Sequence, residues 1–280
     1  MKRVAIQGVS GAFHDIAARQ FFNNEEVEIL PCITFKQVFD AVSDAQDVLG
    51  IVAIENTIAG SLLPNYNLLR ESGHVVVGEH KLRISHCMCA LPGQQLSDIQ
   101  EVYSHPIALR QCEDFLQKHH YIRAVEADDT ALSAKDIADS QVKGRAAICS
   151  AFAAQMYGLE ILADEIETNK RNFTRFLIVA HPDTAGRMRP GLTINKSSVV
   201  FTLPHEEESL AKVLSILSFY HINLTKIQSL PIIGREWEYQ FYINLTFDNY
   251  ERYRQSLDAI RPLLKDFQVL GEYGEAETPQ

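Results

Sequence analysis

Short apolar runs alternate with amphipathic stretches over the first 180 residues. Runs rich in β-branched residues, such as RVAIQ at 3–7 and LGIVAI at 49–54, have the length and composition of buried strands. The alternation is typical of an α/β fold, in which helices cover a parallel or mixed sheet. Thr34, Thr130 and Ser150 stand where they would cap the following helices. The pattern predicts strands at 3–7, 27–30, 49–54, 74–91, 101–104, 121–126, 145–149 and 173–180, and helices at 12–22, 34–45, 61–71, 106–119, 130–139 and 150–157.

The apolar run HVVVGEHKLRISHCMCAL at 74–91 is too long for one ordinary strand. It predicts a chain that leaves one sheet and enters another, and residues 159–180 are expected to return the same way. Two crossings imply two lobes with a cleft between them, a common position for small-molecule sites.

Residues 181–196 (HPDTAGRMRPGLTINK) interrupt this pattern. They contain two prolines and two glycines with little apolar periodicity, so they predict a linker. The order expected after the linker, strand, helix, two strands, helix and strand, is the ferredoxin-like βαββαβ arrangement. These elements are predicted at 198–203, 209–220, 224–230, 237–247, 249–267 and 268–273.

Composition excludes several classes of function. The 280-residue chain is 46% hydrophobic, enough for more than one core, and has a formal net charge of −10. No stretch is dense in Lys and Arg, so nucleic acid is not an expected partner. No window approaches the roughly 20 apolar residues that span a bilayer. The start lacks the apolar region of a secretory signal, so we expect a cytoplasmic protein without a membrane partner.

The five cysteines do not follow a metal or disulfide pattern. Their number is odd, and the closest pair, Cys87 and Cys89, is separated by a single residue. Buried thiols in a reducing compartment explain them better, so we expect neither a metal site nor disulfides.

Polar side chains directly follow several predicted strands. Ligands of open α/β sheets bind at such carboxyl ends, although each position taken singly fits a helix cap or turn as well. Three or four of these ends converging on one cleft would favour a binding site. The residues concerned are Glu55, Asn56 and Thr57 after one strand, His105 after another, and Asp129 and Thr130 after a third.

Two further segments offer candidate chemistry. GVSG at 8–11 joins a strand to a helix, so N–H groups near Gly11 would receive a carboxylate, with a plain tight turn as the alternative. NFTRF at 172–176 interrupts an apolar strand, where alternation puts Thr174 and Phe176 on one side and Arg175 on the other. A hydroxyl and a cationic fork suit proton donation and carboxylate binding. An edge-strand arginine paired with a surface carboxylate is the alternative.

Six segments, taken together and in this order, resemble prephenate dehydratases. The resemblance covers residues 1–180, and the Thr-Arg-Phe triplet is its most diagnostic part. After the linker, INLTKIQSLPIIGREWEYQFYINL (222–245) resembles an ACT domain. The six segments are GVSGAF (8–13), IENTIAGS (54–61), HPIALRQC (105–112), DTALSAK (129–135), AAICSAFAAQMYGL (146–159) and NFTRF (172–176).

The resemblance implies a two-lobed, type 2 periplasmic-binding-like catalytic domain over residues 1–180. Lobe one would comprise about 1–78 plus 165–180, and lobe two about 79–164. A ferredoxin-like ACT regulatory domain would follow at 197–275, in a homo-oligomer that is a dimer or tetramer. The implied reaction needs no cofactor: prephenate loses water and carbon dioxide to give phenylpyruvate, on the route to L-phenylalanine.

The resemblance also assigns roles to residues. Thr174 is expected to donate a hydrogen bond to the departing hydroxyl, with Asn56 and Arg175 as the other catalytic residues. Arg175, or helix-start amides near Gly11, would hold the carboxylates. Substrate binding is assigned to Gly11, Glu55, Thr57, His105, Asp129, Thr130, Asn172 and Phe176.

Some positions depart from the family pattern. His14 and Asp15 stand where the family usually has Ser and Glu, and His14 would alter the pH dependence if it faces the cleft. The Gly-Ala-Leu-Val effector segment reads ESLA at 208–211, and the Glu-Ser-Arg-Pro segment reads QSLP at 228–231. L-Phenylalanine is the implied effector, and these losses predict weakened or altered feedback. The expected effector-binding residues are Ser209, Leu210, Ala211, Asn223, Leu224, Gln228 and Ser229.

Two other functions compete with this one. Arogenate dehydratase acts on the amino analogue of prephenate, and one contact to ammonium instead of a keto group would decide between the two. A non-enzymatic amino-acid sensor is the second alternative. Retention of Thr174, Arg175 and Phe176 argues against a sensor, which needs no proton donor.

Overall fold

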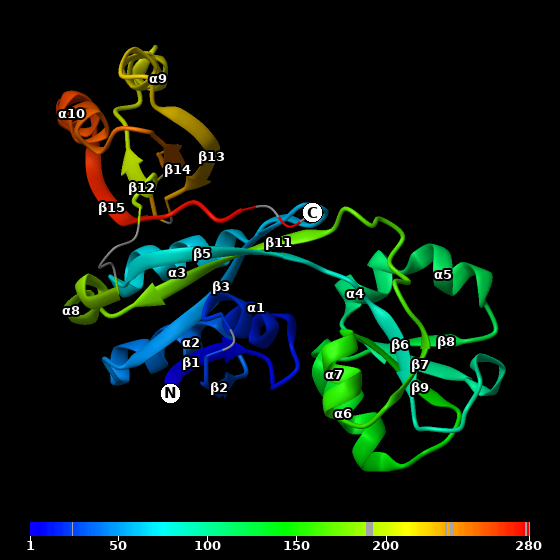
Figure 1. Cartoon of the computed structure of the whole chain (residues 1–280). Helices are drawn as coiled ribbons and strands as arrows, with labels where there is room; N and C mark the ends of the chain where they lie inside the picture. Colours follow the sequence, from blue (N-terminus) through cyan, green and yellow to red (C-terminus); the bar gives the residue numbers. More distant parts are fainter. Residues whose placement is uncertain (24, 189–192, 233, 236–237, 278, 280) are drawn as a thin grey trace.

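The computed structural model describes residues 1–23, 25–188, 193–232, 234–235, 238–277 and 279 (Figure 1). A first lobe is built on five strands of a mixed sheet, in the order β5-β11-β3-β1-β2. Strands β1, β2 and β3 are parallel, whereas β11 is antiparallel to both β3 and β5. The strands are β1 (Lys2–Gln7), β2 (Val27–Cys32), β3 (Val48–Asn56), β5 (Val75–Arg83) and β11 (Phe173–Ala180), and a short β4 (Gly60–Ser61) pairs with β3.

Helices cover both faces of this sheet. Along β11, Phe176 and Ile178 pack in the apolar cluster that contains α1, whereas Leu177 and Val179 pack with α2 and α3. Consecutive residues therefore serve opposite faces, as the alternation predicts. The helices are α1 (Phe13–Phe21) and the short α8 (Pro182–Ala185) on one face, and α2 (Phe35–Asp44) and α3 (Leu63–Ser72) on the other.

The second lobe, green in Figure 1, is a separate five-stranded sheet in the order β10-β6-β9-β7-β8. Helices α6 and α7 cover one of its faces, and α4 and α5 cover the other. Its strands are β6 (Cys87–Ala90), β7 (Glu101–Ser104), β8 (Arg123–Glu126), β9 (Arg145–Cys149) and β10 (Glu160–Ala163). Its helices are η1 (Leu96–Asp98), α4 (Pro106–Gln111), α5 (Glu113–Lys118), α6 (Thr130–Ser140) and α7 (Ala151–Met156).

Two connections join the lobes. The predicted run at 74–91 divides at residues 84–86, so that β5 belongs to the first sheet and β6 to the second. The chain returns through residues 164–172 to β11, which runs beside β5 in Figure 1. The N–H of Ile84 donates to Asn172 O at 2.7 Å, and the N–H of Ile166 donates to His86 O at 2.9 Å. The two connections are thus hydrogen-bonded to each other.

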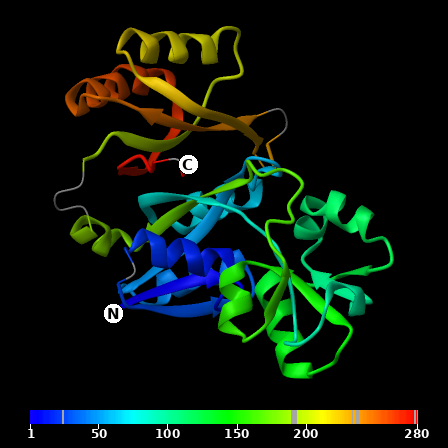
Figure 2. The ribbon, with the colours of Figure 1, turned by 45° about the vertical axis from the view of Figure 1, so that its right-hand side comes forward.

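The segment 193–277, which we call the C-terminal unit, has the predicted βαββαβ order. Its strands lie in the ferredoxin-like order β13-β14-β12-β15, and α9 and α10 cover one face. Strand β15 pairs in parallel with β5 at Gly271 and Val76, so the unit extends the first-lobe sheet to ten strands. In Figures 1 and 2 the unit lies over the first lobe. Its elements are β12 (Lys196–Thr202), α9 (Ser209–Phe219), β13 (Asn223–Pro231), β14 (Tyr239–Thr246), α10 (Tyr250–Ile260), η3 (Arg261–Leu263) and β15 (Lys265–Tyr273).

Some predicted boundaries are wrong. The helix at 106–119 is interrupted at Cys112, whose φ of −106° and ψ of 22° separate α4 from α5. The helix at 249–267 ends at Ile260, because Pro262 lies in the 3-10 turn η3 and the following residues pair with β12. The predicted linker holds α8 and the turn η2 (Gly186–Met188). Linker residues 189–192, and residue 237 of the strand predicted at 237–247, lie outside the described residues.

None of the helices in the described part of the chain has both the length and the apolar character needed to cross a membrane.

Candidate active site

A cavity of about 320 Å³ opens between the two lobes. The first lobe contributes the ends of β1 and β3 and the start of α1, and the second lobe contributes the segments that follow β7 and β8. The expected convergence of polar strand ends on one cleft is therefore observed. Six of the predicted site residues line the cavity: Asn56, His105, Asp129, Thr130, Thr174 and Phe176.

Thr174 and Asn56 form a hydrogen-bonded pair in the cavity wall. They lie opposite each other in the register of β3 and β11, and Asn56 Nδ2 donates to Thr174 Oγ1 at 3.0 Å. Asn56 Oδ1 accepts from the N–H groups of Ile58 (3.0 Å) and Ala59 (2.8 Å), which determines the orientation of the amide. No acceptor among the described residues takes the Thr174 hydroxyl hydrogen. That hydrogen is therefore available to a ligand.

Asn172 and Thr57 support this pair without lining the cavity. Asn172 is fully buried, and its Oδ1 accepts from Asn56 Nδ2 at 2.8 Å. Thr57 Oγ1 accepts from the N–H of Phe173 at 2.9 Å and donates to Arg171 O at 3.1 Å. These positions correct the prediction that both side chains contact the substrate, because neither lines the cavity, and Asn172 Oδ1 and Thr57 Oγ1 instead help to hold β3 against the start of β11.

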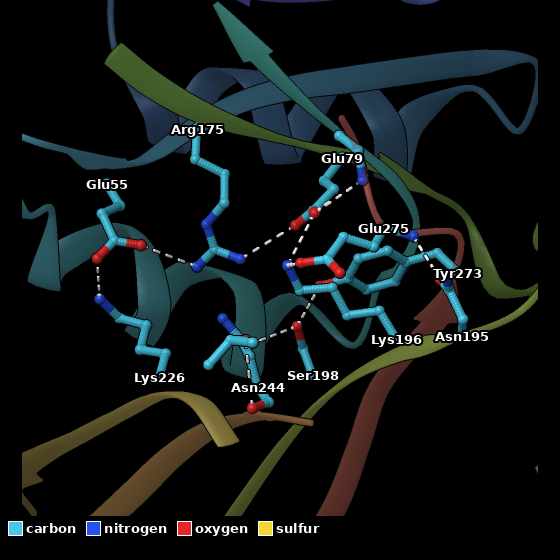
Figure 3. A network of polar contacts seen from close by, with 12 residues as sticks. Glu55, Glu79, Arg175, Asn195, Lys196, Ser198, Lys226, Asn244, Tyr273 and Glu275 are labelled. Carbon is cyan, nitrogen blue, oxygen red and sulfur yellow. Dashed lines mark hydrogen bonds and ion pairs between the residues drawn. The ribbon is translucent and has the colours of Figure 1, made fainter. Parts of the chain in front are cut away.

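Arg175 and Glu55 do not line the cavity. Figure 3 shows their side chains directed toward each other within a network that includes Lys226 and Lys196 of the C-terminal unit. The side chain of Arg175 is 10% exposed and forms ion pairs with Glu79 and Glu55, both at 3.2 Å. Glu55 also pairs with Lys226 of the C-terminal unit at 2.7 Å. These contacts correct the predictions that Arg175 holds a substrate carboxylate and that Glu55 binds substrate. Strand alternation directs both side chains toward the C-terminal unit.

Gly11 does not line the cavity either. Its φ is +91°, and its N–H already donates to Asp15 Oδ2 at 2.8 Å, which corrects the prediction that this amide receives a carboxylate. The first turn of α1 does reach the cavity, through Phe13 and His14. Its N-cap residue, Ala12, has no side chain that can cap the helix. The helix start remains a suitable place for an anion, one to three residues beyond the predicted one.

Two histidines in the cavity wall are poorly solvated. Burial lowers the pKa of His14 to about 4, and burial also lowers the pKa of His86. Within the described residues, His14 Nε2 and His86 Nδ1 have no hydrogen-bond partner. The His14 ring lies edge-on to Phe176, with 5.0 Å between the ring centroids. Because both pKa values lie below the usual 6.5, the neutral form of each imidazole predominates near pH 7.

The sequence analysis missed two residues that line the cavity, His86 and Gln111. The distance between His86 Nε2 and Gln111 Oε1 is 2.8 Å. His86 is a polar residue at the point where the long apolar run crosses between the sheets. That interruption was the available signal.

Two predicted residues of the second lobe, His105 and Asp129, line the cavity and also cap helices. His105 Nδ1 accepts from the N–H of Ile107 at 3.2 Å at the start of α4, and Asp129 Oδ1 accepts from the N–H of Leu132 at 2.9 Å at the start of α6. Burial raises the pKa of the Asp129 carboxyl group. Thr130 is the first residue of α6 and is not its cap. The two interpretations of these strand ends are thus compatible.

The predicted effector residues lie in two parts of the C-terminal unit. Ser209 and Leu210 line a hollow of about 130 Å³ at the start of α9, together with Tyr239 and Phe241 of β14. Ala211 lies on the exposed side of α9. Asn223, Leu224, Gln228 and Ser229 lie along β13 and do not line this hollow. The described residues of one chain therefore do not bring the seven together in one pocket.

The sequence of this chain is similar to those of several known proteins. Residues 4–184 match the prephenate dehydratase family. Arogenate dehydratase 2 of Petunia hybrida is 37% identical over 97% of this chain and 71% of its own length. The chloroplastic arogenate dehydratase/prephenate dehydratase 2 of Arabidopsis thaliana is 36% identical over 97% of this chain and 72% of its own length.

Solved structures show the same fold over nearly the whole chain. GqqA, described as a novel type of quorum quenching acylase, has a TM-score of 0.84 at 30% identity and covers 97% of each chain. The prephenate dehydratase of Staphylococcus aureus has a TM-score of 0.81 at 25% identity, over 97% of this chain and 100% of its own. The prephenate dehydratase of Arthrobacter aurescens, in complex with L-Phe, has a TM-score of 0.83 at 24% identity, over 98% and 90%.

Proposed function

This chain belongs to the prephenate dehydratase family, and we propose that the cavity between its lobes is where prephenate loses water and carbon dioxide to give phenylpyruvate. It is a lyase of aromatic amino acid biosynthesis. The observation that carries the assignment of the site is the Thr174 hydroxyl, which faces the cavity while Asn56 holds its oxygen at 3.0 Å.

The chemistry requires little more than orientation and a proton donor. As the ring carboxylate leaves as carbon dioxide, its bonding pair enters the ring and the C–O bond to the hydroxyl breaks, which completes the aromatic ring. Thr174 donates a hydrogen bond to the departing oxygen, and the bond from Asn56 strengthens this donor. A threonine hydroxyl is too weak an acid to finish the transfer, so a water or a neighbouring group relays the proton that makes water.

The substrate carboxylates need partners other than Arg175. Among the described lining residues there is neither Lys nor Arg. We therefore assign one carboxylate to the first turn of α1, where Phe13 and His14 line the cavity and no side chain caps the helix. Phe176, on the same side of β11 as Thr174, offers the ring an apolar surface.

Arogenate is the second candidate substrate, because the curated relatives are named as arogenate dehydratases or as enzymes of both kinds. The two substrates share the ring and its hydroxyl, so Thr174 and Asn56 would act in the same way on either. They differ where one carries a keto group and the other an ammonium.

The C-terminal unit is proposed to be an ACT regulatory domain at 197–275, joined by the linker 181–196 to the catalytic domain at 1–180. L-Phenylalanine is the proposed effector, since the Arthrobacter aurescens relative is described in complex with it. Altered effector segments favour weak feedback, so titration calorimetry should detect weak binding at most. Tight binding would contradict this proposal.

We also propose that the chain forms a homo-oligomer, either a dimer or a tetramer, and that it is cytoplasmic. The named Arabidopsis relative is chloroplastic.

The test is a spectrophotometric assay of the purified chain with prephenate and with arogenate, with and without L-phenylalanine. We expect phenylpyruvate from prephenate. Thr174→Val, which keeps the shape but removes the hydroxyl, should lower kcat by about 10² to 10⁴. Thr174→Ser should retain most of it. Near-normal turnover by Thr174→Val would contradict the assigned role.

An N-acyl amide is included in the assay because GqqA is described as an acylase. We expect no hydrolysis. None of the described lining histidines is hydrogen-bonded to a hydroxyl or thiol that it could activate as a nucleophile.

A further inference from the structure

Strand β13 of the C-terminal unit makes a direct contact with the segment that carries Asn56. The ammonium of Lys226 lies 2.7 Å from Glu55 Oε1 and 2.7 Å from Ser61 Oγ. Its side chain is 9% exposed and lies over the Tyr66 ring, 5.7 Å from the centroid. Lys226 is thus a nearly buried cation whose partners belong to the first lobe.

The two partners of Lys226 lie on paired strands. Glu55 on β3 is opposite Ser61 on β4, and Asn56 is opposite Gly60. The turn between these strands contains the N–H groups of residues 58 and 59 that hold the Asn56 amide. A single lysine therefore binds both strands of the hairpin 55–61 immediately beside Asn56.

The backbone of β13 is shaped for this contact. Its register with β14 shifts between Leu224 and Lys226, a bulge of the kind that redirects a side chain. Asn244, which pairs with Lys226 on β14, lies against Arg175: with its amide oxygen turned to the guanidinium, it accepts from Nη1 at 2.9 Å and Nη2 at 2.8 Å. Strands β13 and β14 therefore contact Glu55 and Arg175, the chain neighbours of Asn56 and Thr174.

These contacts belong to a continuous network of polar side chains (Figure 3). Glu55 joins Lys226 to Arg175, and Glu79 joins Arg175 to Lys196 of β12 at 2.8 Å. Two members of this network are chain neighbours of the catalytic pair, since Glu55 precedes Asn56 and Arg175 follows Thr174. The network therefore contains Glu55 of β3 and Arg175 of β11, whereas the pair contains their chain neighbours Asn56 and Thr174. The network and the pair lie on opposite faces of these two strands.

The Glu55 carboxylate is paired with two cations, Lys226 and Arg175. Burial alone raises the pKa of Glu55, but the hydrogen bonds and charges of Lys226 and Arg175 outweigh burial and hold that pKa below its usual value. Without Lys226, Glu55 would keep only Arg175 as a cationic partner, and the hairpin would lose the group that joins its two strands.

We propose that Lys226 is a positioning residue for the dehydration: it holds the hairpin 55–61 so that Asn56 keeps its hydrogen bond to Thr174. Lys226 does not line the cavity and does not touch substrate. Its role makes the C-terminal unit part of the catalytic apparatus, beyond any binding of an effector. The proposal rests on the proposed function, because it concerns the same reaction and the same threonine.

The test compares Lys226→Met, Lys226→Arg and the control Lys212→Met in the full chain. Lys212 lies in the same unit, with a 58% exposed side chain 3.6 Å from Glu208, so its loss should change nothing measurable. Lys226→Met should lower kcat for prephenate by about ten- to a hundredfold, because small displacements near a reacting group cost this much. KM should stay within about twofold, because substrate contacts are unchanged. Lys226→Arg should retain most of the wild-type kcat, since the arginine guanidinium can still reach Glu55.

Equal kcat for Lys226→Met and Lys212→Met would overturn the proposal, as would a rise in KM without a fall in kcat. If Lys226→Met fails to fold, Glu55→Gln combined with Lys226→Met removes the uncompensated carboxylate; a wild-type kcat in this folded double variant would also overturn the proposal. A wild-type chain inactive on prephenate and arogenate would instead overturn the proposed function. The two failures are therefore distinguishable.

Discussion

At the scale of residues, the function of this chain depends on which face of a strand a side chain occupies. Thr174 and Arg175 are adjacent in sequence, yet Thr174 lines the cavity and Arg175 is buried among the carboxylates beneath the C-terminal unit. The same division separates Asn56 from Glu55 on β3. In each motif of adjacent polar residues, one side chain thus lines the cavity and the other joins the ion pairs beneath the C-terminal unit.

Asn56→Asp removes the hydrogen bond to Thr174, together with those that the same amide nitrogen donates to Asn172 Oδ1 and Phe173 O. The aspartate keeps an oxygen for the N–H groups of residues 58 and 59, but it replaces the donor to Thr174 with an acceptor. The Thr174 hydroxyl would then donate to Asp and no longer to the substrate. We expect kcat to fall by roughly 10²-fold. The melting temperature should also fall, because Asn172 Oδ1 and Phe173 O lose their buried donor. Steady-state kinetics and thermal unfolding check this, and an unchanged kcat would show that the bond has no catalytic role.

His14 predicts a dependence of stability on pH. Burial lowers its pKa from 6.5 to about 4, so between these pH values the unfolded chain binds a proton that the folded chain does not. The effect of His14 on the free energy of unfolding is absent above pH 6.5. As pH falls from 6.5 toward 4, the neutral, buried His14 destabilises the fold increasingly. His14→Asn should therefore lose less stability than wild type between pH 7 and pH 5 in urea unfolding. Equal losses would show that His14 is not responsible.

At the scale of elements, caps and strand pairing determine where helices begin and end. The predicted caps Thr34 and Ser150 both accept a hydrogen bond from the third residue of their helix. At α6, Asp129 takes that role in place of Thr130. The predicted helix at 249–267 was too long because apolar spacing in its last turn also fits β15, and pairing with β12 prevails.

Thr34→Ala should destabilise the chain without affecting catalysis. Thr34 accepts from the N–H of Gln37 at 3.3 Å, and Gln37 Oε1 accepts from the N–H of Thr34 at 3.3 Å. Removing this cap should cost about 1 kcal/mol of unfolding free energy. Since α2 packs on the sheet face away from the cavity, kcat should be unchanged. Chemical denaturation and the activity assay check the two statements, and a large loss of kcat would contradict the second.

At the scale of the molecule, one ten-stranded sheet joins the C-terminal unit to the first lobe. The apolar cluster beneath it contains Val52 and Leu177 of the first lobe together with Tyr242, Leu270 and Tyr273 of the unit. The cavity lies on the other face, between the lobes. Asn244 of the C-terminal unit thus contacts Arg175, the chain neighbour of Thr174, while none of the described residues of the unit lines the cavity.

Gly271→Ala tests this junction. A Cβ at position 271 would overlap the backbone oxygen of Val76, the residue with which Gly271 pairs across β15 and β5. Relieving the overlap would push the two strands apart and cost about 1 to 3 kcal/mol. Gly186→Ala is the control, since a Cβ there meets nothing within 4 Å. Equal unfolding midpoints for the two variants would show that the junction contributes little.

The sequence by itself determined the alternation of strands and helices, the division of the run at 74–91 between two sheets, and the βαββαβ order after the linker. These features follow from periodicity and cap residues within short windows, which are properties of local sequence. Alternation also put Thr174 and Phe176 on one side and Arg175 on the other, as observed.

Only the tertiary structure decided what each side faces. Asn56 meets Thr174 across 118 residues of chain, and Lys226 meets Glu55 across 171. Such contacts depend on the register of paired strands and on the packing of one unit against another, which no local pattern contains. For this reason the residue types of the site were predictable, whereas the partners of Arg175, the place of His86 in the cavity wall and the contacts of the C-terminal unit were not.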